Sequence, residues 1–359
     1  MDTLTHALSG ALLARALTPS RPRAAPRVFG PPVPVWQALV VGTVAATFPD
    51  GDAVLKLVSE LAYLRGHRGV THSLLMLPLW ALLLGAAAAL GFRNRAGFPR
   101  YAWLAAAAIA VHIAGDWITQ FGTMLLAPMS DTRFGLGSVF IIDLVLSGII
   151  VAGLVGSAVL YRSRVPALIA LALLPAYVTL TVVAKNDAIS FARGWAHDQG
   201  ITAVEVDAAP RPASPFNWTV VVFDGSDYHY AHVNVRRAEP LQAAAHDNFI
   251  RRYSAPYQPL SQAAWQRVPK YGGTDPALAR EVWQRPEFAF FRWFAMFPLV
   301  HRVDAAAAET CVWYRDLRFG FPGRTEVPFR YGLCRQGAGT HWLPYAPDDD
   351  AAGGRTALH

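Results

Sequence analysis

The chain has 359 residues, of which 53% are hydrophobic and 16% are charged, and its formal net charge is +7. This composition excludes an ordinary soluble globular domain and predicts a protein integral to a membrane. Arginine supplies nearly all of the positive charge. In a membrane protein such an excess bears on orientation before it suggests nucleic acid, so no nucleic-acid partner is expected.

Six apolar runs approach the length that a helix needs to cross a bilayer, about 20 residues. In chain order they are residues 4–17, 35–48, 73–92, 101–118, 136–161 and 165–184. The predicted fold is mainly α, a polytopic membrane helical bundle with about six crossings, of which the first two are short. The first run lacks the basic start and the small-residue cleavage site of a secretory signal, so we expect it to be retained.

The composition changes after the last apolar run, where Pro, Trp, Tyr and charged residues become frequent. We therefore predict a membrane-embedded helical domain with a metal site at 1–188, an extracytoplasmic α+β domain at 189–345 and a disordered tail at 346–359.

Two strand pairs are predicted in the second domain. Alternating runs at 218–223 and 228–235 flank an Asp-Gly-Ser-Asp turn, which predicts a hairpin, and a second pair is predicted at 310–319 and 324–333. The two cysteines of the chain, Cys311 and Cys334, lie on this second pair. They form a disulfide if the compartment is oxidising, or remain two buried thiols, and the sequence favours neither.

Arginine-rich connectors at 15–27, 93–100 and 162–164 separate the apolar runs. Under the positive-inside tendency all three face the cytoplasm. This orientation puts the N-terminus, the polar segments 49–71 and 119–135, and the C-terminal domain on the outer side of the membrane.

Histidines and aspartates of the first 190 residues gather at one predicted membrane face. The candidate metal ligands are His6, Asp50, Asp52, His67, His72, His112 and Asp116. An ionisable group inside a span costs at least a few kcal/mol, so His112 and Asp116, four residues apart on one helix face, carry most weight. Imidazole and carboxylate ligands suit a divalent metal, zinc above all.

Charged neighbours of these ligands suggest further roles. Arg65 and Arg68 lie on the outer side against the positive-inside tendency, which indicates either a clamp for phosphate or carboxylate or contacts with lipid headgroups. Asp143 is predicted to orient a ligand histidine or to pair with Arg133. The aromatic and arginine residues of the C-terminal domain could line a substrate entrance, although surface packing explains them equally.

Four motifs, MDTLTHALSG, FPDGD, HRGVTHS and HIAGDWITQFGT, occur in this order within residues 1–184. Together they resemble the YdjM-type family of bacterial inner-membrane proteins, described as predicted metal-dependent hydrolases. The segment HIAGD at 112–116, followed by Gln120, is also remotely similar to zinc-dependent phospholipase C and P1-type nucleases, and Gln120 is expected to support a metal ligand. This chain has Phe121 and Gly122 where those enzymes supply a further histidine, so the resemblance implies one or two ions rather than three.

These observations favour a membrane-bound hydrolase with a divalent metal, Zn²⁺ being favoured over manganese or iron, acting on a phosphoester or lipid-linked substrate at the outer face of a bacterial inner membrane. The metal would activate a water molecule, Asp52 or Asp50 would act as general base, and Arg65 and Arg68 would stabilise developing negative charge. A non-catalytic scaffold with a structural metal is the main alternative. A transporter is disfavoured because the polar residues stop at one membrane face.

Overall fold

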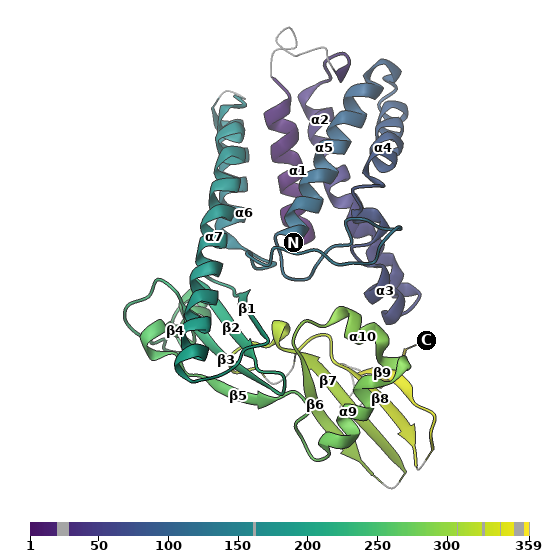
Figure 1. Ribbon diagram of the computed structural model, residues 1–359. Coiled ribbons are helices and arrows are strands. Elements are labelled where there is room, and N and C mark those ends of the chain that lie inside the picture. Colours follow the sequence, from purple (N-terminus) through teal and green to yellow (C-terminus); the bar gives the residue numbers. More distant parts are fainter. Residues whose placement is uncertain are drawn as a thin grey trace.

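A computed structural model describes residues 1–19, 29–160, 163–306, 308–324, 327–337, 339–347 and 355–358. Parts of two arginine-rich connectors and of the tail, residues 20–28, 161–162, 348–354 and 359, lie outside the described residues. The N-terminal region is helical, and the C-terminal region is built mainly from two β-sheets (Figure 1).

Each of the six apolar runs contains one helix. The helical elements of this region are α1 (Thr3–Leu17), α2 (Val35–Thr47), η3 (Phe48–Leu57), α3 (Glu60–Gly66), η4 (Val70–His72), α4 (Leu77–Gly91), η5 (Arg95–Gly97), α5 (Phe98–Trp117), α6 (Leu144–Val159) and α7 (Val165–Asp198). α6 begins later than the apolar run that predicts it because Asp143 caps it, accepting a hydrogen bond of 2.8 Å from the backbone N–H of Leu146.

By length and hydropathy, two helical stretches of the described residues can cross a membrane, Val35–Leu57 and Val165–Asp198. Glu60–His72 and Leu77–Gly91 form a third if they are one span bent by 77°. Leu144–Val159 is apolar but shorter. A membrane-embedded region is therefore supported, while the expectation of about six crossings is not confirmed by these lengths.

The helices of the bundle expose two different ends (Figure 1). At one end lie the C-termini of α1, α4 and α6, and η5 follows α4 there. At the other end lie the N-terminus, η3, the loop that follows α5, and the whole C-terminal region. The arrangement matches the predicted grouping of basic connectors on one side and His/Asp motifs on the other.

Small residues bring α1 and α2 into direct backbone contact. A Cβ atom added to Gly42 would lie 2.5 Å from the carbonyl oxygen of Gly10 and 2.6 Å from the Cβ of Ala14. Only glycine permits this approach, as at close crossings of membrane helices. The contact holds the start of η3, which follows α2 directly, beside the first turns of α1.

The C-terminal region contains two five-stranded sheets with short helices against them. One sheet has the order β1-β2-β3-β4, with β5 on β3, and the other has the order β10-β9-β8-β7-β6. The strands are β1 (Glu205–Pro210), β2 (Asn217–Phe223), β3 (Asp227–Asn234), β4 (Gln258–Pro259), β5 (Gln266–Pro269), β6 (Pro298–Ala305), β7 (Glu309–Asp316), β8 (Tyr331–Gln336), β9 (Leu343–Pro347) and β10 (Arg355–Ala357). The helices are α8 (Phe249–Ser254), η6 (Leu260–Gln262), α9 (Pro276–Gln284), η7 (Pro286–Phe288), α10 (Ala289–Phe294) and η8 (Leu317–Phe319).

Both predicted strand pairs form, β2 with β3 and β7 with β8, each antiparallel. The second pair is shorter than predicted because β8 begins only at Tyr331. The prediction of a disordered tail is wrong for Arg355–Ala357, which forms β10 and pairs with β9. Backbone hydrogen bonding to the edge of the sheet orders these residues, and composition alone does not reveal it.

Cys311 and Cys334 face each other across β7 and β8 and form a disulfide. The alternative of two free thiols is thereby excluded. Disulfides persist mainly in oxidising compartments, which agrees with an extracytoplasmic C-terminal region.

α7 connects the two regions and runs past the predicted domain boundary at residue 188. Ala184, Ala188, Ala192 and Ala196 recur every four residues and are buried against the first sheet, where Trp218 and Val220 of β2 pack. The C-terminal part of α7 therefore packs on the β-sheet, so one helix links the apolar bundle to the C-terminal region.

The C-terminal region docks on the end of the bundle that holds the His/Asp motifs. Arg318 donates to the carbonyl oxygen of Gln120 at 3.1 Å, and the Tyr331 hydroxyl donates to Glu60 at 3.1 Å. Trp293 donates to the carbonyl oxygen of Asp131 at 3.1 Å. These bonds fix the sheets against the loop after α5 and against α3.

We predict that Gly42→Leu separates α1 from α2 and destabilises the folded protein by about 1–3 kcal/mol or more, because the added side chain meets backbone. A lower thermal unfolding temperature in lipid nanodiscs measures the effect. Gly148→Leu on α6 is the matched control, since an added Cβ there meets no atom within 4 Å. Equal unfolding temperatures for the two variants would contradict the close packing.

The disulfide predicts how the two cysteines of the chain react with a thiol label in cells. Protein trapped with acid and then denatured should take up no maleimide-polyethylene glycol until it is reduced, and two molecules afterwards. Labelling of both cysteines without reduction would place them in a reducing compartment and contradict the predicted outward orientation of the C-terminal region.

Candidate metal centre

Five side chains from four parts of the bundle converge on one buried point. His6 comes from α1, Asp50 from η3, His72 from η4, and His112 and Asp116 from α5. Ligand atoms of His6, Asp50, His112 and Asp116 all lie within 4.8 Å of one another. The sequence predicted this convergence, since all five residues were placed at one membrane face.

The distances between the donor atoms match those expected between ligands that bind the same ion. Nε2 of His72 lies 3.1 Å from Oδ2 of Asp116 and 3.8 Å from Oδ1 of Asp50. Nε2 of His112 lies 3.4 Å and 3.7 Å from the same two oxygens. Ligands bound tetrahedrally at about 2.0–2.1 Å lie about 3.3 Å apart, so these residues fit a zinc-sized cation.

Outer hydrogen bonds fix which imidazole nitrogens face the centre. Nδ1 of His112 contacts the carbonyl oxygen of Ala46 at 2.6 Å, so it must carry the proton and leave a lone pair on Nε2. Nδ1 of His72 lies 3.4 Å from Oδ2 of Asp52. The two Nε2 atoms are 2.9 Å apart. At this distance the two nitrogens either share one proton or are bound to the same cation, and carboxylate or carbonyl partners behind ligand histidines are typical of metal sites.

Asp116 is as fully buried as His72 and His112, and its carboxylate is incompletely hydrogen-bonded. Its side chain is 0% exposed, and Oδ2 accepts no hydrogen bond. Oδ1 accepts from Arg68 at 2.9 Å and from the Met1 amino group. An orphaned carboxylate oxygen that points at two imidazoles is the expected ligand atom of a divalent ion.

Gly115 lets α1 approach α5 at this point. A Cβ on Gly115 would lie 3.2 Å from the imidazole carbon Cε1 of His6. The His6 ring stacks on the His112 ring with their centroids 3.7 Å apart, and its Nε2 lies 3.1 Å from Oδ1 of Asp116. The glycine of the HIAGD motif thus admits His6 to the centre.

Asp52 and His67 lie beside the centre rather than in it. Oδ1 of Asp52 bonds Nδ1 of His67 at 2.7 Å, while Oδ2 accepts from the Arg68 N–H at 3.0 Å and from the Thr71 hydroxyl at 3.1 Å. Both carboxylate oxygens are therefore occupied. This placement differs from the predicted ligand roles of Asp52 and His67, and from the predicted general base at Asp52.

The two predicted anion-binding arginines have different environments. Arg68 is 2% exposed, bonds Asp116 and Thr119, and has a φ of 60°. A non-glycine residue in the left-handed region is uncommon and is often found at functional sites. Arg65 lies on the exposed side of α3. Of the two, Arg68 is the one held at the centre.

Asp143 and Gln120, which were predicted to support the metal ligands, do not contact the centre. Asp143 caps α6 and accepts from the Tyr177 hydroxyl at 2.7 Å, in place of the predicted pairing with a ligand histidine or Arg133. Arg133 instead donates to backbone carbonyls of Leu64 and Gly122. Gln120 lies in the loop that receives Arg318, with its amide nitrogen buried and unbonded.

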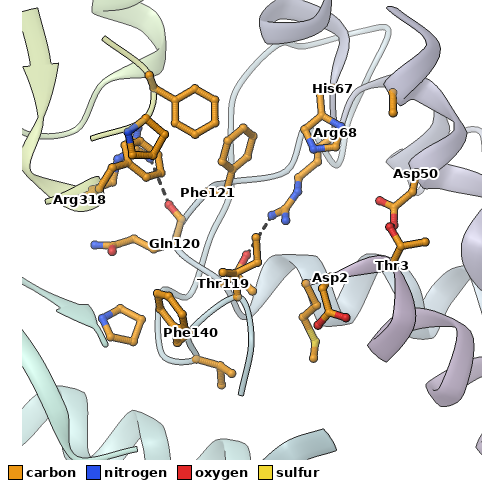
Figure 2. Close-up of a pocket in the computed structure, with 18 of the residues that line it drawn as sticks. Asp2, Thr3, Asp50, His67, Arg68, Thr119, Gln120, Phe121, Phe140 and Arg318 are labelled. Carbon is orange, nitrogen blue, oxygen red and sulfur yellow. Dashed lines mark hydrogen bonds between the residues drawn. The ribbon is translucent and has the colours of Figure 1, made fainter. Parts of the chain in front are cut away.

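A cavity of about 540 Å³ adjoins the centre. Asp50, His67 and Arg68 line one side of it, and Phe121, Phe140 and Arg318 lie toward the other (Figure 2). Its volume lies in the range of small-molecule sites. Sequence reasoning missed the specific residues that the C-terminal region contributes, because no motif links them to the bundle.

Comparison with known proteins places the bundle in a family. Residues 1–188, just over half of the chain, match the family described as YdjM inner membrane protein. The "Uncharacterized protein YfhP" of Bacillus subtilis (strain 168) is 32% identical over 145 residues, which cover 40% of this chain and 42% of YfhP. The matched segment thus spans less than half of that relative. No solved structure matches the chain.

We predict that the purified protein binds a divalent metal and that His112→Ala and Asp116→Asn each weaken binding by more than the 10–100-fold that loss of an outer-shell partner costs. Elemental analysis after dialysis against metal buffers measures this. His197→Ala is the control, because that side chain is 90% exposed. Metal retained at wild-type affinity in both ligand variants would exclude this centre.

Proposed function

The chain belongs to the YdjM inner-membrane family, and from this premise we propose that it is a metal-dependent hydrolase of phosphoesters. One observation carries the proposal: the buried cluster of histidines and aspartates opens, through Asp50, His67 and Arg68, onto a cavity of substrate size. A structural metal site is closed by protein ligands, whereas a catalytic site borders accessible space.

We further propose that the bundle crosses the bacterial inner membrane several times and that the metal centre and the C-terminal region face outward. The disulfide and the exposed arginines at the opposite end of the bundle support this orientation. The substrate is then reached from the extracytoplasmic side.

His72, His112, Asp50 and Asp116 would hold the ion, with His6 as a further ligand, and one or two zinc ions suit this donor set. A bound divalent ion supplies Lewis acidity and a water molecule of lowered pKa. Arg68 lines the cavity next to Asp116, so its guanidinium can attract an anionic ester and stabilise charge that develops on it.

His67 is the group best placed to move a proton. Asp52 holds its Nδ1, which leaves Nε2 as the atom that exchanges a proton, and the ring lines the cavity. Asp52 then orients the imidazole and stabilises its protonated form, a division of labour known from other carboxylate-histidine pairs. His67 is then the general base, in place of the predicted Asp52.

His67→Gln should keep the metal and lose hydrolysis of aryl phosphate esters by about 10²- to 10⁴-fold, the usual contribution of general acid–base catalysis. Asp52→Asn should lose hydrolysis as well and also weaken metal binding, because Asp52 lies behind the ligand His72. Phosphate release in nanodiscs and elemental analysis of the same samples measure the two effects. His197→Gln serves as the control at an exposed histidine.

Chelation should abolish turnover, and added zinc should restore it. If stoichiometric metal accompanies no turnover of any phosphomonoester or phosphodiester, the centre is structural and the hydrolase proposal fails.

A further inference from the structure

The cavity beside the metal centre has two unlike walls. One wall carries the polar groups Asp50, His67 and Arg68 of the bundle (Figure 2). The other wall is mostly aromatic: Phe121 and Phe140 of the bundle and Phe319, Phe321 and Phe329 of the C-terminal region lie there, next to Arg318. Such a division suits a ligand that has one charged end and one apolar end.

The apolar wall is continuous across the two regions. The Phe140 ring, in the loop before α6, meets the Phe321 ring edge-on with centroids 6.0 Å apart. The ring centroids of Phe121 of the bundle and Phe329 are 5.7 Å apart, and those of Phe329 and Phe319 are 4.6 Å apart. Aromatic side chains bury much apolar area, so an alkyl chain against them gains free energy with each methylene.

Two cationic side chains, Arg68 and Arg318, line the cavity near the boundary between the two walls, and Arg133 lies on the Phe121 ring, which also lines it. The guanidinium groups of Arg68 and Arg133 both lie over the Phe121 ring, 4.8 Å and 5.2 Å from its centre, and Arg318 lies over the Phe294 ring at 4.9 Å. Burial, together with the neighbouring Arg318 and Arg68, lowers the pKa of Arg133 to about 9. Mutual repulsion among these cations favours an anion in the cavity.

Apolar side chains at the rim extend the cavity toward lipid. Ile141 lines it and is 41% exposed, and the adjoining Ile142 and Leu144 are exposed as well. These residues lead into α6, whose outward face is apolar. A ligand with a hydrocarbon chain can enter from the membrane surface without full transfer through water.

We propose that the cavity selects anionic amphiphiles, with the anionic head at Arg68 beside the metal centre and one hydrocarbon chain against Phe321 and its neighbours. The C-terminal region thereby sets substrate selectivity. This inference rests on the proposed function, since it names the substrate class of the same site.

The test uses two sets of probes on the full chain in nanodiscs: n-alkyl phosphonates from ethyl to decyl for calorimetric binding, and the matching n-alkyl phosphates for phosphate release. Wild-type affinity should rise by up to about fourfold per buried methylene until the cavity is full. Phe321→Ala should flatten this dependence and leave ethyl phosphonate binding unchanged. Comparison between variants cancels the partition of long chains into the nanodisc lipid.

Two further variants guard against a folding artefact. Phe321→Trp should fill the cavity and weaken decyl but not ethyl binding. Phe249→Ala, at an exposed phenylalanine of α8, should behave as wild type. Chain-length slopes that are equal in wild type and Phe321→Ala would overturn the inference.

Failure of the inference and failure of the proposed function give different results. Chain-length-dependent binding without phosphate release overturns the hydrolase alone. Phosphate release that is independent of chain length overturns the amphiphile site alone.

Discussion

The rest of the helical region depends on the burial of one carboxylate, that of Asp116. An ionised group without exposure to water costs several kcal/mol unless charges and hydrogen bonds compensate for it. Here the compensation comes from distant parts of the chain: Arg68 from the HRGVTHS loop, His6 from α1 and His72 from η4. Each partner must reach the same point, so the paths of α1, η4 and α5 are mutually constrained.

Small residues make that convergence possible. The backbones of α1 and α2 touch at Gly10 and Gly42, and Gly115 admits the His6 ring. Van der Waals contact of this kind replaces the hydrophobic driving force that helices lack in lipid. In the first and last motifs, therefore, the glycines bring the helices close together. The histidines and the aspartate of the same motifs supply the donor atoms of the candidate metal centre.

The sequence predicts the helices and the site's location better than individual roles. Apolar length reveals helices, and the cost of buried charge marks His112 and Asp116. The spacing of residues along the chain, however, does not distinguish a candidate metal ligand from a residue that holds a ligand in place. Asp50 and Asp52 lie two residues apart on η3, yet one points at the centre and the other at His67. That difference depends on the turn of a short 3₁₀ segment and on which side chains the next loop brings, and neither has a local sequence signal.

For the C-terminal region, too, the sequence predicts the local elements but not their position against the bundle. Its hairpins follow from alternation and turn residues, but its position follows from long-range bonds such as Arg318 to Gln120 and Tyr331 to Glu60. Because Arg318 is 6% exposed and also pairs with Asp316 at 2.8 Å, its guanidinium is held on both sides. The loop that carries Phe319 and Phe321 is thereby fixed over the cavity. Among the described residues, the candidate metal ligands all come from the bundle, so the two sides of the cavity are built by separate parts of the chain.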